Sequence, residues 1–221
     1  MVAAALAQKS VHWEESSFAA YSGYESSVDV TADSGAGQII YPCCTRHNSA
    51  TVQILLVNYT VYVRGDAAGL HITLGYHPWM TKAKATKYAG QWIAIPRGDK
   101  LYAGIARRLT LVSIIHRFTP RAGRFGKLTM TSAGPTGANG PTGPQGPTGA
   151  AVLAGPQEPG YPALLAGPTG AMTVRTRGEP LPVTFSELCY FCEHEGTFSR
   201  WNEPVPVEPP ARSTPIATVR R

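Results

Sequence analysis

The strongest constraint on this chain is a glycine at every third position of GPTGANGPTGPQGPTG, which starts at residue 134. The glycines of this run are Gly134, Gly137, Gly140, Gly143, Gly146 and Gly149. The period is typical of a collagen triple helix, because only glycine fits at its crowded axis. Gly155, Gly167 and Gly170 keep the same frame beyond the uninterrupted run. We expect an extended segment, and two forms stay open: a three-chain stalk and a single-chain polyproline linker.

A triple helix of this length needs help from a neighbouring domain. Six triplets span only about 50–55 Å at roughly 3 Å per residue, so three such strands would be marginal alone. A flanking domain that trimerises would raise the effective concentration of the three strands. We therefore expect a homotrimer, held together by the residues that precede the run.

Those preceding residues have the composition of β-strands. The run TVQILLVNYTVYV, at residues 51–63, is dense in β-branched and aromatic residues and is apolar on both faces. Further strands are predicted in LHITLG, QWIAIP, KLYAGIA and RLTLVSIIHRF, with a basic loop at TKAKATK. Short strands separated by glycine turns predict a mainly β chain with an antiparallel β-sandwich or jelly-roll-like domain.

Composition divides the chain into four segments. We expect an N-terminal arm at 1–36, a β-sandwich domain at 37–132, a collagen-like Gly/Pro-rich connector at 133–172, and a small irregular C-terminal segment with a proline-rich tail at 173–221. No stretch reaches the ~20 apolar residues that span a bilayer, so we predict no membrane span. The start, MVAAALAQKS, has no basic residue before its apolar run and predicts no secretory signal.

Charge is distributed unevenly along the chain. Residues 1–36 contain one lysine and five acidic residues, whereas residues 37–130 contain thirteen lysines and arginines and two acidic residues. We predict a basic interaction face that comprises Lys82, Lys84, Lys87, Arg117, Arg121, Arg124 and Lys127. Its expected partner is the acidic arm of the same or an adjacent subunit. Basic residues interleaved with aromatic residues at fixed spacing are missing, so we expect no specific nucleic-acid partner.

The cysteines provide the only candidate metal ligands. Cys189, Cys192 and His194 follow the order C-x-x-C-x-H, and Cys43, Cys44 or His47 would have to complete a tetrahedral zinc site. Nearly 150 residues separate the two halves, so we expect buried free thiols and no metal. The alternative is a zinc-dependent protein associated with nucleic acid.

No catalytic motif is present. The sequence lacks a G-x-S-x-G element and a phosphate-binding loop, and the histidines of the β-rich block stand apart. We therefore predict neither an enzymatic activity nor a cofactor.

A β-rich block, short G-P-T and G-P-Q triplets and a small C-terminal segment resemble the collagen-like structural proteins of tailed bacteriophages. The phrase IAIPRGDKLYAGIAR, at 93–107, also resembles a strand–turn–strand element of phage virion β-sandwiches, although Arg97 and the pair Gly104-Ile105 depart from it. The resemblance covers residues 38–150 in style rather than as an alignable motif and carries over no binding residue. It implies a non-enzymatic virion component of a tail, fibre or capsid surface that contacts other virion structural proteins and the host surface.

The alternative is a bacterial adhesin, because such triplets also occur in bacterial surface and spore-coat filaments. Two Arg-Gly-Asp tripeptides, at 64–66 and 97–99, would suit receptor binding. Each lies between predicted strands, where Gly-Asp is ordinary turn chemistry. We therefore expect both tripeptides to be turns.

Overall fold

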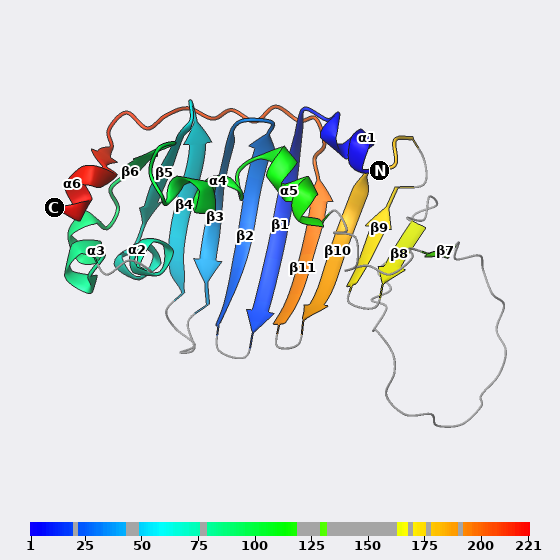
Figure 1. The fold of residues 1–221 in the computed structure, drawn as a ribbon, viewed down its shortest axis with the longest axis horizontal. Coiled ribbons are helices and arrows are strands. Elements are labelled where there is room, and N and C mark those ends of the chain that lie inside the picture. The colour runs from blue at the N-terminus through cyan, green and yellow to red at the C-terminus, as the bar shows by residue number, and fades with distance from the viewer. Residues whose placement is uncertain are drawn as a thin grey trace, which may run out of the picture.

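The chain folds around one large β-sheet, shown in Figure 1. The computed structural model describes residues 1–19, 22–42, 49–75, 79–118, 129–131, 163–167, 170–175, 178–189 and 192–221. The twelve strands follow the order β12-β6-β5-β4-β3-β2-β1-β11-β10-β9-β8-β7. Every neighbouring pair is antiparallel except β12 and β6, which are parallel.

The strands are β1 (Ser10–Ala19), β2 (Ser22–Thr31), β3 (Gly35–Tyr41), β4 (Ala50–Val57), β5 (Thr60–Gly65), β6 (Ile93–Pro96), β7 (Thr129–Thr131), β8 (Ala163–Gly167), β9 (Gly170–Val174), β10 (Pro182–Cys189), β11 (Cys192–Ser199) and β12 (Thr214–Pro215). The helices are α1 (Val2–Leu6), α2 (Ala67–Leu74), α3 (Lys82–Tyr88), α4 (Tyr102–Ala106), α5 (Leu111–Phe118) and α6 (Ile216–Arg220).

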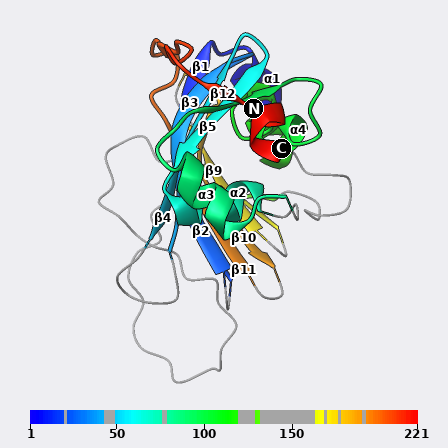
Figure 2. The same cartoon turned by 90° about the vertical axis from the view of Figure 1, so that its left-hand side faces the viewer.

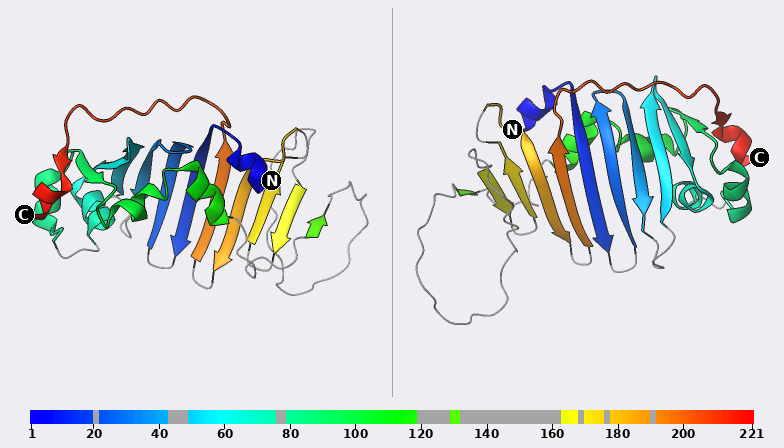
Figure 3. Two further views of the ribbon diagram at one scale, coloured as in Figure 1. Left: turned by 45° about the horizontal axis from the view of Figure 1, so that its top comes forward. Right: turned by 180° about the vertical axis from the view of Figure 1, so that it is seen from behind.

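The predicted class, mainly β and mostly antiparallel, is confirmed. The described residues form a single sheet, and helices lie over one of its faces where a sandwich would place a second sheet (Figure 2). Seen from behind, the other face carries none of the described helices (Figure 3). The architecture is therefore one sheet with one covered face and one open face.

The two ends of the sequence build the middle of the sheet. Residues 1–36, expected as an arm, supply β1 and β2, and the C-terminal segment supplies β10 and β11. β1 pairs with β2 on one side and with β11 on the other. The side chains of β1 alternate between the two faces of the sheet, since Val11 and Trp13 are buried whereas Glu14 is exposed.

Three segments predicted as strands are helices, and the predicted basic loop is helical too. LHITLG lies in α2, KLYAGIA in α4 and RLTLVSIIHRF in α5, whereas TKAKATK forms α3. Helix-capping side chains account for two of these. Asp66 accepts a hydrogen bond from the Gly69 amide at 2.6 Å, and Thr81 accepts one from the Lys84 amide at 3.3 Å. The strand–turn–strand expected at 93–107 is consequently a strand, a turn and a helix.

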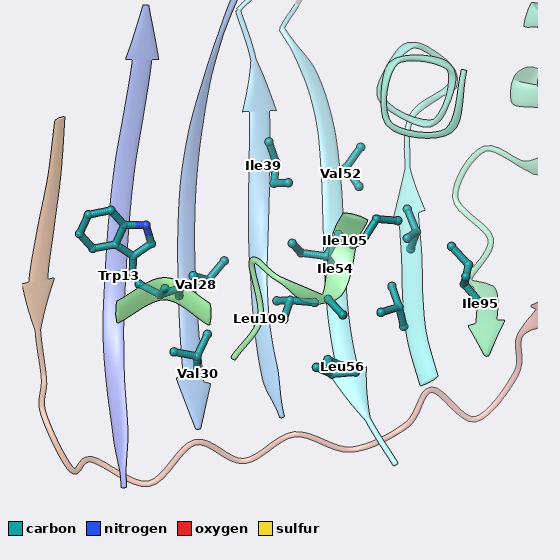
Figure 4. Packing of buried hydrophobic residues seen from close by; sticks show 14 of the residues in the cluster. Trp13, Val28, Val30, Ile39, Val52, Ile54, Leu56, Ile95, Ile105 and Leu109 are labelled. Carbon is teal, nitrogen blue, oxygen red and sulfur yellow. The ribbon is translucent and has the colours of Figure 1, made fainter. Parts of the chain in front are cut away.

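The core lies between the sheet and these helices, as Figure 4 shows. Val28, Ile39, Val52 and Ile54 project from three consecutive strands, β2, β3 and β4, and all are at most 2% exposed. Leu109, which is fully buried, meets them from the helical side. This layer buries the apolar stripe of the sheet, which is the main source of its stability.

The chain after β11 runs along one end of the strands to the opposite edge of the sheet (Figure 1). This connection, which we call the strap, starts at Asn202. The backbone N–H of Asn202 donates to the Ser10 carbonyl at 3.0 Å. At the far edge Thr214 binds the Trp92 carbonyl, and α6 is fixed by an ion pair between Arg220 and Asp99. The strap thus joins the centre of the sheet to its last strand.

Candidate functional site

A buried ionic cluster joins the sheet to α5. Glu15 lies on the covered face of β1 with 3% of its side chain exposed. Arg117 from α5 donates to both of its carboxylate oxygens, and the Nη1–Oε2 distance is 2.9 Å. The Tyr24 hydroxyl of β2 donates to Glu15 Oε1 at 2.8 Å and accepts from Arg117 at 2.9 Å. His194 of β11 places Nδ1 3.7 Å from the same Glu15 oxygen.

This cluster shifts the acidity of two of its members. Burial, followed by the charge of Glu15, raises the pKa of Tyr24 above its ordinary value. Burial acts to lower the pKa of Arg117, but Glu15 and Tyr24 together outweigh it and raise that pKa. Tyr24 therefore stays a neutral donor and Arg117 stays a cation, which suits a structural clamp on the Glu15 carboxylate.

A basic pocket opens beside the clamp, on the helical side of the sheet. Its volume is about 470 Å³, and its described lining consists of Arg107, Arg108, Ser113, His116 and Arg117. Arg108 stacks on the Tyr24 ring, with Cζ 4.5 Å from the ring centroid. Clamp and pocket therefore share Arg117, and Tyr24 of the clamp contacts Arg108 of the pocket.

The open face of the sheet carries a depression of opposite charge, which we call the acidic trough. Its volume is about 400 Å³, and it crosses β11, β1, β2 and β3. Successive side chains of a strand point to opposite faces of the sheet. This alternation directs into the trough the side chains of Glu14, Ser16, Glu25, Ser27, Gln38 and Glu195. Three carboxylates on three adjacent strands make this the most acidic part of the described open face.

A Ser-His-Asp arrangement stands at one end of the trough. His12 Nδ1 lies 2.8 Å from Asp29 Oδ1, and Ser27 Oγ lies 3.4 Å from His12 Nε2. Glu14 competes for the same nitrogen at 3.2 Å. Ser27 sits in the middle of β2, paired with β1 and β3, so the strand ladders occupy the nearby amides that would have to stabilise an oxyanion. The arrangement has the order of a triad but lacks this essential catalytic part.

The structure separates the residues of the predicted basic face. Lys82, Lys84 and Lys87 lie on α3, where Lys84 donates to the Val219 and Arg220 carbonyls at 3.0 and 3.1 Å. Arg117 belongs to the clamp on α5, away from α3 (Figure 1). The remaining members, Arg121, Arg124 and Lys127, lie outside the described residues.

The candidate metal ligands are placed only in part. Cys189 and Cys192 face each other across the β10–β11 hairpin, and His194 is opposite Glu187. Cys43, Cys44 and His47 lie outside the described residues, as does the Gly-X-Y run from Gly134 to Gly149. Among the side chains that the structure describes, no three His, Cys, Asp or Glu residues gather as metal ligands would.

Both Arg-Gly-Asp aspartates are used within the fold. Asp66 caps α2 and also accepts a hydrogen bond from the Thr51 amide at 2.8 Å. Asp99 binds Arg220 with two hydrogen bonds of 2.5 and 2.7 Å. Their carboxylates therefore hold a helix start and the C-terminal helix.

The clamp and the basic pocket were not predicted from the sequence. The sequence pattern assigns Glu15 only to the acidic N-terminal segment. It puts Arg107 and Arg108 next to or at the start of a predicted strand. A signal was present in α5, because Leu111, Ile114 and Ile115 follow helical spacing. That spacing would have directed Ser113, His116 and Arg117 away from the apolar stripe.

Comparisons with known proteins leave the family open. No protein-family model matches the chain, and no curated protein sequence matches it. Among solved structures, the fold is similar to the crystal structure of LprF from Mycobacterium bovis. The TM-score is 0.47 and the identity 12%, over 96% of this chain and 93% of that chain. No function is inferred from a similarity at this level.

None of the described helices is long and apolar enough to cross a bilayer.

Proposed function

We propose that this protein is a non-enzymatic structural component of a larger assembly, in which copies dock head to tail through oppositely charged surfaces. The observation that carries the proposal is the separation of charge between the two sides of the sheet. Residues 67–118, which form most of the helical side, contain eight lysines and arginines and a single acid, Asp99. The acidic trough lies on the open side.

The docking element on the helical side is α3. Lys82 and Lys87 are exposed on this short helix, which stands at the β6 end of the sheet beside α6 (Figure 2). A projecting basic helix is complementary in charge to a hollow lined by Glu14, Glu25 and Glu195. Such an interface joins two different surfaces, so it generates a ring when its rotation closes and a filament when it does not. A closed ring of three would give the expected homotrimer without a triple helix.

The two strands that flank the Gly-X-Y run in the sequence lie at one edge of the sheet. The strands on either side of it, β7 and β8, pair with each other, with Thr131 opposite Leu164. The described residues on either side of the run therefore lie beside each other at one edge of the sheet. A triple helix over 134–149 would extend roughly 45 Å, and residues 150–162 would have to return that distance almost fully extended. This geometry favours the single-chain form of the run over the three-chain stalk.

A location in the virion, with contacts to other virion proteins and to the host surface, completes the proposal. It rests on the Gly-X-Y triplets and on the overall resemblance to collagen-like phage proteins. The segment at 93–107 no longer contributes to that resemblance, because only its first part is a strand.

The assembly can be tested by exchanging charges. The variant E25K/E195K makes the trough basic, and the variant K82E/K87E makes α3 acidic. We expect wild-type protein to form oligomers at low ionic strength that dissociate in high salt, and each variant alone to stay monomeric. An equimolar mixture of the two variants should assemble again, since each then meets the opposite charge. Light scattering coupled to size exclusion reads the mass, and a mixture that stays monomeric would refute the proposal.

A further inference from the structure

Head-to-tail docking through α3 does not use the basic pocket. It lies on the helical side, where its lining residues come from the end of α4 and from α5. Its volume of about 470 Å³ falls within the range of small-molecule sites. We propose that this pocket binds a compact oxyanion of the phosphate or sulfate class.

The first argument is uncompensated charge. Arg117 is neutralised by Glu15, but Arg107 and Arg108 form no ion pair with any described acidic residue. His116, exposed on α5, adds a third group that carries positive charge when protonated. Among the described residues, Glu15 places its carboxylate against Arg117 of the lining, and Arg117 and Tyr24 both bind it. An anion that enters the pocket would therefore balance the charge of Arg107 and Arg108, which no described acidic residue pairs.

The second argument is an unpartnered donor. The Nη1 atom of Arg108 is buried and has no hydrogen-bond partner among the described residues. Its guanidinium is held by the Tyr24 ring, which is fixed in turn by Glu15 and Arg117. A buried donor without an acceptor is costly, so an oxyanion bound against the Arg108 guanidinium would supply the missing interaction once that group turns toward it. The planar fork of an arginine fits two oxygens of a phosphate or sulfate at once.

Ser113 supplies a neutral donor on the same wall. Thr110 Oγ1 donates to Ser113 Oγ at 2.8 Å, so the Ser113 hydroxyl hydrogen can be directed into the pocket. Two arginines and one hydroxyl are a donor set for several oxygens of one tetrahedral anion. A carboxylate offers only two oxygens and would leave part of this set unused.

The test uses the full chain in its E25K/E195K form, which cannot dock its trough and therefore isolates the pocket from the proposed assembly. Inorganic phosphate and sulfate are titrated by calorimetry at constant ionic strength, with acetate and chloride as competing anions. We expect saturable binding of phosphate, with acetate at least tenfold weaker. If phosphate binds but the charge-exchange variants fail to assemble, only the pocket proposal is supported. If the variants assemble but phosphate does not bind, only the proposed function is supported.

Variants locate the bound anion. R107Q removes one exposed cation of the pocket and should weaken phosphate binding at least tenfold without unfolding the protein. R108Q should weaken it further, and circular dichroism checks that its fold is retained. The matched control is R97Q, because Arg97 stacks on Tyr59 at 5.3 Å and lies outside the pocket. The proposal is overturned when phosphate binds no more tightly than chloride, or when R107Q and R97Q have the same affinity.

Discussion

Arg117 and Glu15, 102 residues apart in the sequence, form the ionic contact that anchors α5 to the centre of the sheet. Glu15 is 3% exposed and Arg117 38% exposed, so the carboxylate has far more hydration to lose than the guanidinium. Tyr24 provides a second donor to the same carboxylate. The clamp therefore makes a buried acid tolerable on the covered face.

Removal of the arginine alone should be more harmful than removal of both charges. R117M leaves the Glu15 carboxylate buried with only Tyr24 as donor, and we expect it to lower the free energy of unfolding by about 2–3 kcal/mol, a value reduced for the exposure of Arg117. The double variant E15Q/R117M should recover at least half of that loss. Urea denaturation of the single and double variants measures the coupling. If R117M and the open-face control R64M lower the free energy of unfolding by the same amount, the clamp contributes no stability of its own.

Tyr24 predicts a late step in the alkaline titration of the protein. Burial, followed by the Glu15 charge, raises the pKa of Tyr24 above 10. Its contribution to stability is complete below the unfolded pKa and is lost as the pH rises through the folded pKa. Tyrosinate absorbance should show one of the ten tyrosines ionising later than the bulk. The Y24F variant should lack this late step, and a late step that persists in Y24F would assign it to another tyrosine.

The sequence predicted the class of fold from its strongest strands. Residues 51–63 form β4 and β5, as their β-branched and aromatic composition indicates. The errors fall where apolar residues were taken for strands without attention to capping. In LHITLG the β-branched residues favour a strand, but the Asp66 cap and the packing of Leu70 and Leu74 against the sheet favour a helix. Tertiary packing outweighs a propensity difference of well under 1 kcal/mol per residue.

The candidate site depends on contacts that no local pattern encodes. The clamp joins residues of β1, β2 and α5, and the trough adds β11 from the C-terminal part of the chain. The segment VHWEESSF alternates only imperfectly, because Glu15 and Ser17 occupy positions on the covered face. A buried acid in such a position indicates a distant cation, but the sequence offers twenty lysines and arginines as partners. Only the packing of α5 over β1 and β2 identifies Arg117.

Two glycines provide a matched test of the packing. A Cβ on Gly196 of β11 would overlap the indole of Trp13, whereas a Cβ on Gly104 of α4 would meet nothing within 4 Å. G196A should lower the free energy of unfolding by about 1–3 kcal/mol, because the buried Trp13 and its partner Phe198 must move. G104A should raise it by about 0.4–1 kcal/mol, since alanine restricts the unfolded chain. Thermal denaturation distinguishes the two, and a neutral G196A would contradict the central packing of Trp13.

The C-terminal helix should detach in acid before the sheet unfolds. Hydrogen bonds from Arg220 are the main cause that lowers the pKa of Asp99, and burial opposes them. Because the folded pKa lies below the unfolded one, the stabilisation is present above the unfolded pKa, about 4, and is lost as the pH falls through the folded pKa. The protection of the amides of residues 214–221 against hydrogen exchange, relative to the intrinsic rate at each pH, should therefore fall below about pH 4. D99N should show the faster exchange already at pH 7, whereas D33N, in the exposed turn after β2, should behave as wild type. Slow exchange at 214–221 in D99N would mean that Lys84 and the apolar residues of α6 hold the helix without the ion pair.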